Sequence, residues 1–205
     1  MSILQYSGGS VMAMAGKECF VIVSDNRLGE QLKTISTEVP KLHVINDNVV
    51  LGLTGLRTDQ ITFANKLHFR TELYKLREER NISGKAFASL VASMLYEARF
   101  GPWFVEPVIA SIDSKTGEVY LTAMDLIGAP CEPEDYVCAG TCAESLHGMC
   151  ETLWRPNLEP EELFEVAAQS MLSACDRDSL SGYGAVAMIV TRDKVITRLI
   201  KGRKD

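Results

Sequence analysis

The strongest constraint on the fold is the order in which strands and helices follow one another along the 205 residues. Short apolar segments of strand length come in pairs around turn residues, and pairs of helical segments separate them. Segregated runs of antiparallel strands and paired helices are typical of the α+β class and argue against a parallel βαβ fold. Two antiparallel sheets that stack face to face, each covered by one helix pair, give a four-layer αββα sandwich. This is the predicted fold.

Turn residues such as the Gly16 turn and Asn46-Asp47-Asn48 separate the segments of predicted strand. The predicted strands cover residues 11–15, 19–24, 41–45, 49–53, 108–112, 119–122, 136–139, 184–190 and 195–200. The predicted helices cover residues 59–80, about 83–98, 143–153 and about 160–172. The sequence contains no linker, low-complexity stretch or convincing repeat, so residues 1–205 are predicted to form a single domain.

Composition excludes several classes of function. The net charge of −6 argues against a nucleic-acid-binding protein, which needs clustered Lys and Arg to neutralise phosphates. No segment has the roughly 20 consecutive apolar residues of a transmembrane helix, so no membrane partner is expected. The N-terminal sequence MSILQYSGGS lacks the basic and apolar regions of a signal peptide. These features together predict a protein of the cytoplasm and nucleus.

The cysteines fit the same compartment. They form no C-x-x-C pair, and no His lies at a zinc-ligand spacing from such a pair, so no metal site is predicted. Several lie among apolar neighbours, where a free thiol behaves as a small hydrophobic group. We therefore expect free thiols rather than disulfides at Cys19, Cys131, Cys138, Cys142, Cys150 and Cys175.

Four segments carry a family resemblance through their order and spacing. They are FVIVSDNR at 20–27, PKLHVIN at 40–46, LTGLRTD at 53–59 and RDSLSG at 177–182. Together they make the chain similar, over essentially its whole length, to the β-type subunits of the eukaryotic 20S proteasome, which are N-terminal-nucleophile hydrolases. Residues 100–102, 106–108, 125–128 and 140–144 are most similar to one non-catalytic subunit type of that family.

The resemblance implies that the chain keeps the residues that support catalysis in active members but lacks the nucleophile. Active members cut their own chain before a Thr, whose hydroxyl becomes the nucleophile while the freed α-amine acts as the base. In these members a nearby Lys tunes the proton transfer, an Asp holds the Lys, and a backbone N–H at a Gly stabilises the oxyanion. The resemblance matches these supporting positions to Asp25, Lys41, Gly55, Asp178 and Ser181. In active members the Asp and Lys follow the Thr by 16 and 32 residues, and both spacings lead back to Gly9. Glycine has no nucleophile, so the resemblance implies a catalytically inactive subunit of a threonine-protease complex.

Ser10 is the alternative nucleophile, because a Gly-Ser bond resembles the family's Gly-Thr cleavage site. Its spacings to Asp25 and Lys41 are 15 and 31, which do not fit the pattern of active members. A shift of one residue along a strand also turns a side chain to the opposite face. An active Ser10 hydrolase therefore remains the alternative to a Ser that packs or caps at the start of a strand.

Structural interpretations stand beside the catalytic ones. Asp25 and Lys41 are interpreted as a buried ion pair between the two sheets, and Asp178 and Ser181 as residues that hold a loop. A third hypothesis, an unrelated α+β binding module, is opposed by the ordered set of four motifs.

The resemblance also implies partners and modifications. It places the chain in a heteroheptameric ring of β subunits that contacts an opposing β ring and an α ring. In that ring, Asp125 and Cys131 are expected to line a neighbour's catalytic pocket. Residues 1–9 are expected to remain as a short N-terminal extension, with Met1 removed and Ser2 acetylated. No cofactor is expected.

Overall fold

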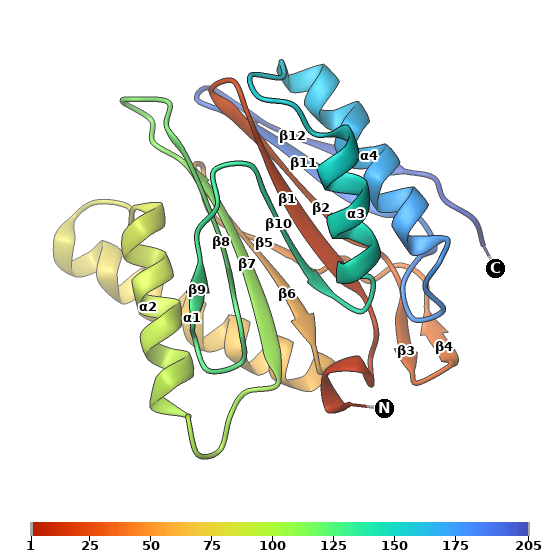
Figure 1. Cartoon of the computed structure of the whole chain (residues 1–205). Coiled ribbons are helices and arrows are strands. Elements are labelled where there is room, and N and C mark those ends of the chain that lie inside the picture. Colours follow the sequence, from red (N-terminus) through yellow and green to blue (C-terminus); the bar gives the residue numbers. More distant parts are fainter. Residues whose placement is uncertain (1, 205) are drawn as a thin grey trace.

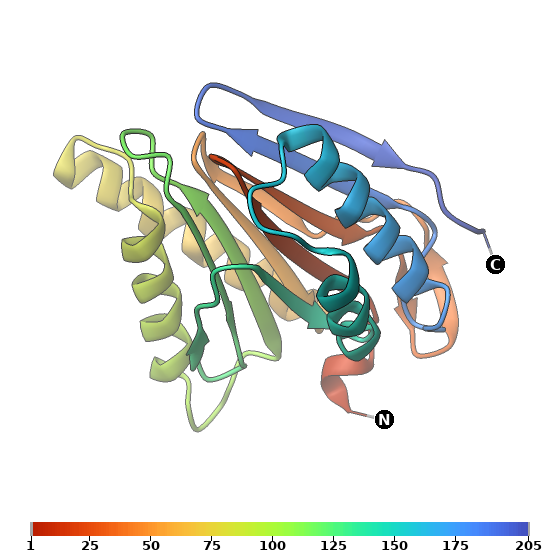
Figure 2. The ribbon, with the colours of Figure 1, turned by 45° about the horizontal axis from the view of Figure 1, so that its top comes forward.

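Two five-stranded antiparallel sheets lie face to face between two helix pairs in the computed structural model, which describes residues 2–204 (Figure 1). The turned view in Figure 2 shows the helix pairs on opposite outer sides of the sheets. The predicted αββα sandwich is therefore confirmed. None of the helices within residues 2–204 is long and apolar enough to cross a membrane.

The first sheet contains the start and the end of the chain and is covered by α3 and α4. Its strand order is β10-β1-β2-β11-β12, all antiparallel. The strands are β1 (Ser10–Gly16), β2 (Cys19–Asp25), β10 (Tyr136–Gly140), β11 (Ala185–Thr191) and β12 (Val195–Ile200). The helices are α3 (Ala143–Leu153) and α4 (Pro160–Cys175).

The second sheet is built from the middle of the chain and is covered by α1 and α2. Its strand order is β5-β6-β7-β8-β9. The strands are β5 (Leu42–Asn46), β6 (Val49–Gly55), β7 (Val105–Ile112), β8 (Val119–Met124) and β9 (Pro130–Cys131). The helices are α1 (Arg57–Glu78) and α2 (Gly84–Glu97).

Strands β1 and β2 of the first sheet are apolar on both faces because both faces are covered there. In β1, Val11 and Ala13 belong to the core between the sheets, whereas Met12 and Met14 belong to the core under α3 and α4. Successive side chains of a strand point to opposite faces, so a strand between two layers needs apolar residues at every position. This explains why β1 and β2 lack a polar–apolar alternation.

Local signals set several helix ends. The Ser83 hydroxyl accepts a hydrogen bond from the Ala86 N–H and caps α2. Pro160 occupies the first turn of α4, where its missing N–H costs no helical hydrogen bond. Glu161 and Glu162 follow in the same turn and are stabilised by the helix dipole.

A short hairpin and an N-terminal turn were absent from the sequence prediction. The hairpin consists of β3 (Leu28–Glu30) and β4 (Lys33–Ser36), and the 3-10 turn η1 spans Ile3–Gln5. The hairpin is only partly buried and has no apolar run, so hydrophobic periodicity could not reveal it. Both elements lie near the start of β1 (Figure 1).

Candidate functional site

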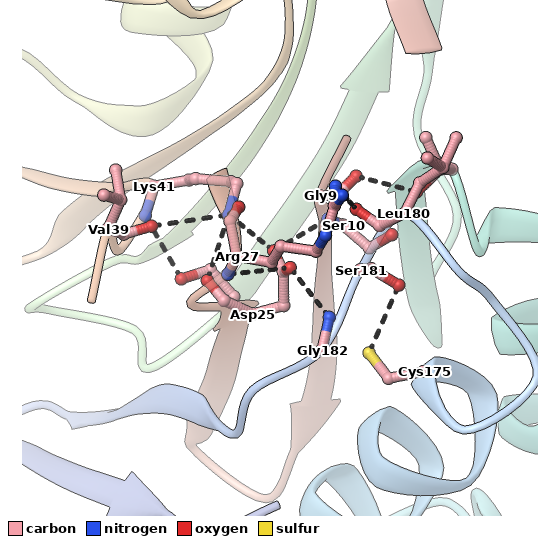
Figure 3. Close-up of polar contacts among 12 residues, drawn as sticks. Gly9, Ser10, Asp25, Arg27, Val39, Lys41, Cys175, Leu180, Ser181 and Gly182 are labelled. Atoms are coloured by element: carbon pink, nitrogen blue, oxygen red, sulfur yellow. Dashed lines mark hydrogen bonds and ion pairs between the residues drawn. The ribbon is translucent and has the colours of Figure 1, made fainter. Parts of the chain in front are cut away.

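The candidate site is centred on a buried ion pair at the end of β2. The Lys41 Nζ lies 2.6 Å from Asp25 Oδ1, and both side chains are at most 1% exposed. The same ammonium group donates to the carbonyl oxygens of Asp25, Arg27 and Val39 at 3.2, 2.9 and 3.3 Å. Lys41 precedes β5 of the second sheet, so the pair links the two sheets, as predicted (Figure 3).

The Asp25 carboxylate is satisfied by groups from several parts of the chain. Its Oδ1 also accepts the Ser10 N–H at 3.0 Å. Its Oδ2 accepts the N–H groups of Arg27 at 3.2 Å and Gly182 at 3.1 Å. A buried charge is tolerated when it is paired and hydrogen-bonded in this way. Asp25 therefore fixes β1, the start of β5 and the loop after α4 to one another.

Gly9 lies directly against this ion pair. It has a φ of +106°, and a Cβ at this position would come within 2.2 Å of Lys41 Cε and 2.9 Å of Lys41 Nζ. Its N–H donates to the Leu180 carbonyl at 3.0 Å, and its own carbonyl accepts the Thr141 N–H at 3.0 Å. Position 9 thus faces the Lys41 amine without a hydroxyl or thiol.

Ser10 is turned toward a different part of the fold. It is fully buried, and its Oγ accepts the Cys142 N–H at the start of α3 at 3.0 Å. Among the hydrogen bonds of residues 2–204, those of Lys41 Nζ go to carbonyl groups and Asp25, and none goes to the Ser10 hydroxyl. Ser10 therefore joins β1 to α3, and an active Ser10 hydrolase is not favoured.

Asp178 and Ser181 hold the loop between α4 and β11. The Asp178 Oδ2 accepts the hydroxyls of Ser181 at 2.7 Å and Thr141 at 2.5 Å, and its Oδ1 accepts the Leu180 N–H at 3.1 Å. Within the described residues, no hydrogen bond joins Asp178 or Ser181 to Lys41. The pair is linked to the site through the loop, whose Gly182 binds Asp25, and through Thr141, whose N–H binds the Gly9 carbonyl.

Gly55 has a conformational role at the end of β6. It has a φ of +102°, and a Cβ there would come within 2.3 Å of the Phe104 carbonyl oxygen. Its own carbonyl accepts the Gln60 side-chain amide at 3.0 Å. Only glycine fits this close approach of two backbone segments. The oxyanion role that the resemblance implies for this position stays a prediction.

Arg27 is a central residue that the sequence reasoning did not single out. The residue is 1% exposed, and its guanidinium donates to the Leu180 carbonyl at 3.0 Å and the Gln31 carbonyl at 2.9 Å. A Cβ at Gly8 or Gly29 would come within 2.8 or 2.5 Å of this group. The signal in the sequence was the Asp-x-Arg motif at 25–27 together with these two small residues.

The residues before Gly9 are part of the fold. The Tyr6 carbonyl accepts the Gln31 N–H at 2.8 Å, and the Ser7 carbonyl accepts the Gly29 N–H at 3.0 Å. Ser7 is also buried, with an exposed fraction of 4%. The segment before Gly9 is thus attached to the β3–β4 hairpin. Ser2 is exposed and caps η1, and its acetylation stays a prediction.

The two residues predicted to line a neighbour's pocket lie on the exposed segment at 125–131, Asp125 in the turn after β8 and Cys131 in β9. The Asp125 Oδ1 accepts the N–H groups of Ile127 at 3.1 Å and Ala129 at 2.9 Å, which closes the turn. Cys131 pairs with Ala123 across β9 and β8, and it is the exposed member of the cysteines. The loop thus presents a carboxylate and a thiol to the surface.

The chain belongs to the proteasome subunit family. The family model described as "Proteasome subunit" matches residues 6–190. The relatives identify the subunit type. The chain is 85% identical to "Proteasome subunit beta type-3" of Trypanosoma brucei brucei, over the full length of both chains. It is 53% identical to the protein of the same name from Drosophila melanogaster and 49% identical to that from Picea mariana, again over both full lengths. The predicted family and subunit type are confirmed.

Proposed function

We propose that this chain is a non-catalytic structural subunit of the β ring of the 20S proteasome core, where it supports ubiquitin-dependent protein degradation. The family match and the β type-3 relatives support this role. The subunit acts through assembly and through the surface that it gives to its neighbours. Its catalytic chemistry is absent because Gly9 occupies the position at which active members carry the Thr nucleophile.

The contact between position 9 and Lys41 carries this proposal. A Cβ at Gly9 would touch the Lys41 side chain, so a nucleophile placed there would sit beside an amine able to assist proton transfer. The present residue offers no such group. Asp25, Lys41 and the Gly182 N–H remain as a saturated buried network that joins the sheets.

The proposal includes the assembly around the chain. The chain is placed in a heteroheptameric β ring that contacts an opposing β ring and an α ring, within a threonine-protease complex of the cytoplasm and nucleus. The exposed loop with Asp125 and Cys131 is assigned to the border of a neighbour's catalytic pocket. Carboxylates at such a border favour basic substrate side chains through charge complementarity.

Intact-mass measurement of the chain from the purified complex tests the inactive-subunit proposal. The expected mature form lacks Met1, keeps residues 2–9 and carries an acetyl group on Ser2. A main species that begins at Ser10 would show self-cleavage and would overturn the proposal. Quantitative analysis of the proteins that co-purify through this chain tests the ring, because fixed equal stoichiometry with other β and α subunits is expected.

A further inference from the structure

The segment at residues 6–9 is held firmly by the fold although it belongs to no helix or strand. Ser7 is 4% exposed, whereas Ile3 is 50% exposed and Tyr6 is 38% exposed. Among the described residues, none before Ser10 belongs to the hydrophobic cores of the sandwich. The segment is therefore held by polar contacts rather than by burial of apolar side chains.

The main chain of this segment bonds to separate parts of the molecule. The Ser7 carbonyl accepts the Gly29 N–H at 3.0 Å, and the carbonyl before it accepts the Gln31 N–H at 2.8 Å, both in the β3–β4 hairpin. The Gly9 N–H donates to the Leu180 carbonyl, in the loop before β11, at 3.0 Å (Figure 3). In peptide recognition, main-chain hydrogen bonds of this kind give affinity and side-chain contacts give specificity.

The Ser7 side chain adds a contact with the second sheet's helix layer. Its Oγ accepts the N–H of Arg57, the first residue of α1, at 3.1 Å. Leu56, in the N-cap position of that helix, makes no side-chain hydrogen bond. The first N–H groups of a helix have no partner within it, and a Ser hydroxyl is a preferred acceptor for them. A residue 50 positions away along the chain thus supplies the cap.

Gly8 makes these surroundings selective for a residue without a side chain. It has a φ of +70°, and a Cβ there would overlap the Leu180 carbonyl oxygen and come within 2.8 Å of Arg27 Nη1. Gly9 follows with a φ of +106°. Residues with a side chain rarely adopt such values. The surrounding groups therefore fit a short peptide in which a Ser is followed by two glycines.

The groups that hold the segment are themselves held by other contacts. The Arg27 guanidinium donates to Gln31 and Thr34 in the hairpin and to the Leu180 carbonyl in the loop, so it fixes these two parts to each other. Helix α1 packs on the second sheet through its own apolar residues. None of these contacts involves residues 6–9. The surrounding groups should therefore keep their arrangement when the segment leaves.

We propose that residues 6–8 are the resident ligand of a peptide-binding site formed by the β3–β4 hairpin, the start of α1 and the loop before β11. The ligand class is a short peptide with a hydroxyl-bearing residue followed by glycine. The chain's own segment excludes other peptides from this site, which lies beside Gly9 and Lys41. The inference rests on the proposed retention of residues 2–9 in the mature chain.

The experiment uses the purified complex with its peptidase activities blocked by a covalent inhibitor. Gly8→Val in the full chain should expel the segment, because a branched side chain fits neither the φ nor the space at this position. The probe is a synthetic peptide of residues 2–8 with a photoreactive phenylalanine analogue in place of Tyr6, whose hydroxyl bonds to Glu30. The probe should cross-link to residues 28–36 of the variant at a concentration at least about tenfold lower than wild type requires.

Two controls test whether the recognition is specific. Ile3→Ala changes an exposed residue of the same N-terminal region, so this complex should exclude the probe as wild type does. A probe that carries Gly8→Ala should bind the Gly8→Val complex about tenfold more weakly than the unaltered probe. If Gly8→Val does not assemble alone, both probes are added during assembly, and only the unaltered probe should restore it.

The proposal is overturned if the probe fails to cross-link the assembled variant, or cross-links variant and wild type equally. Failure of the probe to restore assembly of a variant that needs it also overturns the proposal, because the segment would then be an ordinary part of the fold. A mature wild-type chain that begins at Ser10 would instead overturn the proposed function. Intact mass therefore distinguishes the two failures.

Discussion

The ion-pair cluster and the loop at residues 125–131 use their charged groups in opposite ways. The ion-pair cluster consists of Gly9, Ser10, Asp25, Arg27 and Lys41, all of them buried. The Asp25 carboxylate and the Lys41 ammonium group form their hydrogen bonds with other groups of the same chain. In the loop, Asp125 uses one oxygen to close its own turn and is exposed to solvent.

This difference indicates where each region acts. A buried and saturated carboxylate can hold sheets and loops in place, but it has no lone pair left to offer a substrate or a partner. An exposed carboxylate whose second oxygen is not used by the turn can act on a molecule outside the chain. The ion-pair cluster is therefore expected to control the stability of the subunit, and the loop to control what a neighbour recognises.

Substitution of Lys41 is expected to have the largest effect. Lys41→Met leaves the Asp25 carboxylate buried without its counter-charge, which should cost about 3–5 kcal/mol of stability. We expect a lower thermal unfolding temperature and a lower yield of complex that contains the chain. The matched control is Lys17→Met, which breaks the Lys17–Glu159 bridge, whose side chains are 60% and 59% exposed. Exposed pairs contribute little, so the control should assemble normally.

A double variant separates lost charge pairing from lost packing. Asp25→Asn combined with Lys41→Met removes both charges and keeps an oxygen that can accept the Ser10 N–H. Assembly should be partly restored relative to Lys41→Met alone. Assembly of Lys41→Met at the wild-type level would contradict the structural role of the ion pair.

The second prediction concerns Gly9. Gly9→Ala should destabilise the subunit by about 1–3 kcal/mol, because the position has a φ of +106° and the new Cβ would meet Lys41. Gly148→Ala in α3 is the control, since a Cβ there meets nothing within 4 Å and alanine favours helix by about 1 kcal/mol. Thermal unfolding of the two purified complexes should shift in opposite directions. Gly9→Thr should give no new peptidase activity. The new Cβ would push the Lys41 side chain out of its present position, and catalysis tolerates misplacement of a catalytic group by only about 1 Å.

The fold was largely predictable because its signals are local. Apolar runs of strand length and turn residues such as Asn46-Asp47-Asn48 gave the hairpins, and Ser83 and Pro160 marked helix starts within a residue or two. The β3–β4 hairpin gave no such signal. Backbone hydrogen bonds from Gly29 to Ser7 and from Gln31 to Tyr6 support it, and such long-range pairing leaves no pattern in a single sequence.

The site was predictable only in part for the same reason. Spacing relative to a known family placed Gly9 beside Lys41 and Asp25, and the geometry agrees. The hydrogen bond from the Cys142 N–H to Ser10 Oγ joins residues 132 positions apart, and no motif linked them. Arg27 was visible only as part of a motif, because its role depends on carbonyl groups of Gln31 and Leu180.

The third prediction tests the exposed side of the comparison. Asp125→Asn keeps the Oδ1 that accepts the Ile127 and Ala129 N–H groups, so the loop should hold its shape while losing its charge. Cleavage after basic residues by the complex should fall about twofold. Two opposite charges about 8 Å apart in water attract each other by roughly half a kcal/mol, and the loss of that attraction between Asp125 and a basic substrate side chain changes a rate by about this factor. Cleavage after acidic residues should not change. Glu134→Gln is the control for a charge lost from the same exposed segment.

Ionic strength sharpens the Asp125 test. A direct charge effect should be largest at low salt and should fade as the screening length shortens to about 8 Å at physiological ionic strength. Equal rates for wild type and variant on basic fluorogenic peptides at low salt would leave the loop with no role beyond packing.

The smallest expected effect on activity belongs to Ser10, the residue that most resembles a nucleophile. Ser10→Ala removes the acceptor of the Cys142 N–H, which should cost about 1 kcal/mol of stability, while all peptidase activities of the assembled complex stay unchanged. Peptidase assays with basic, acidic and apolar substrates, each normalised to the amount of assembled complex, measure this. Ser10→Thr is the matched control, because its hydroxyl can still accept that N–H. Selective loss of one activity in Ser10→Ala, with normal assembly and with rescue by Ser10→Thr, would show that the Ser10 hydroxyl takes part in catalysis. The ion-pair cluster would then be a catalytic site, and it would no longer differ from the exposed loop by acting only on stability.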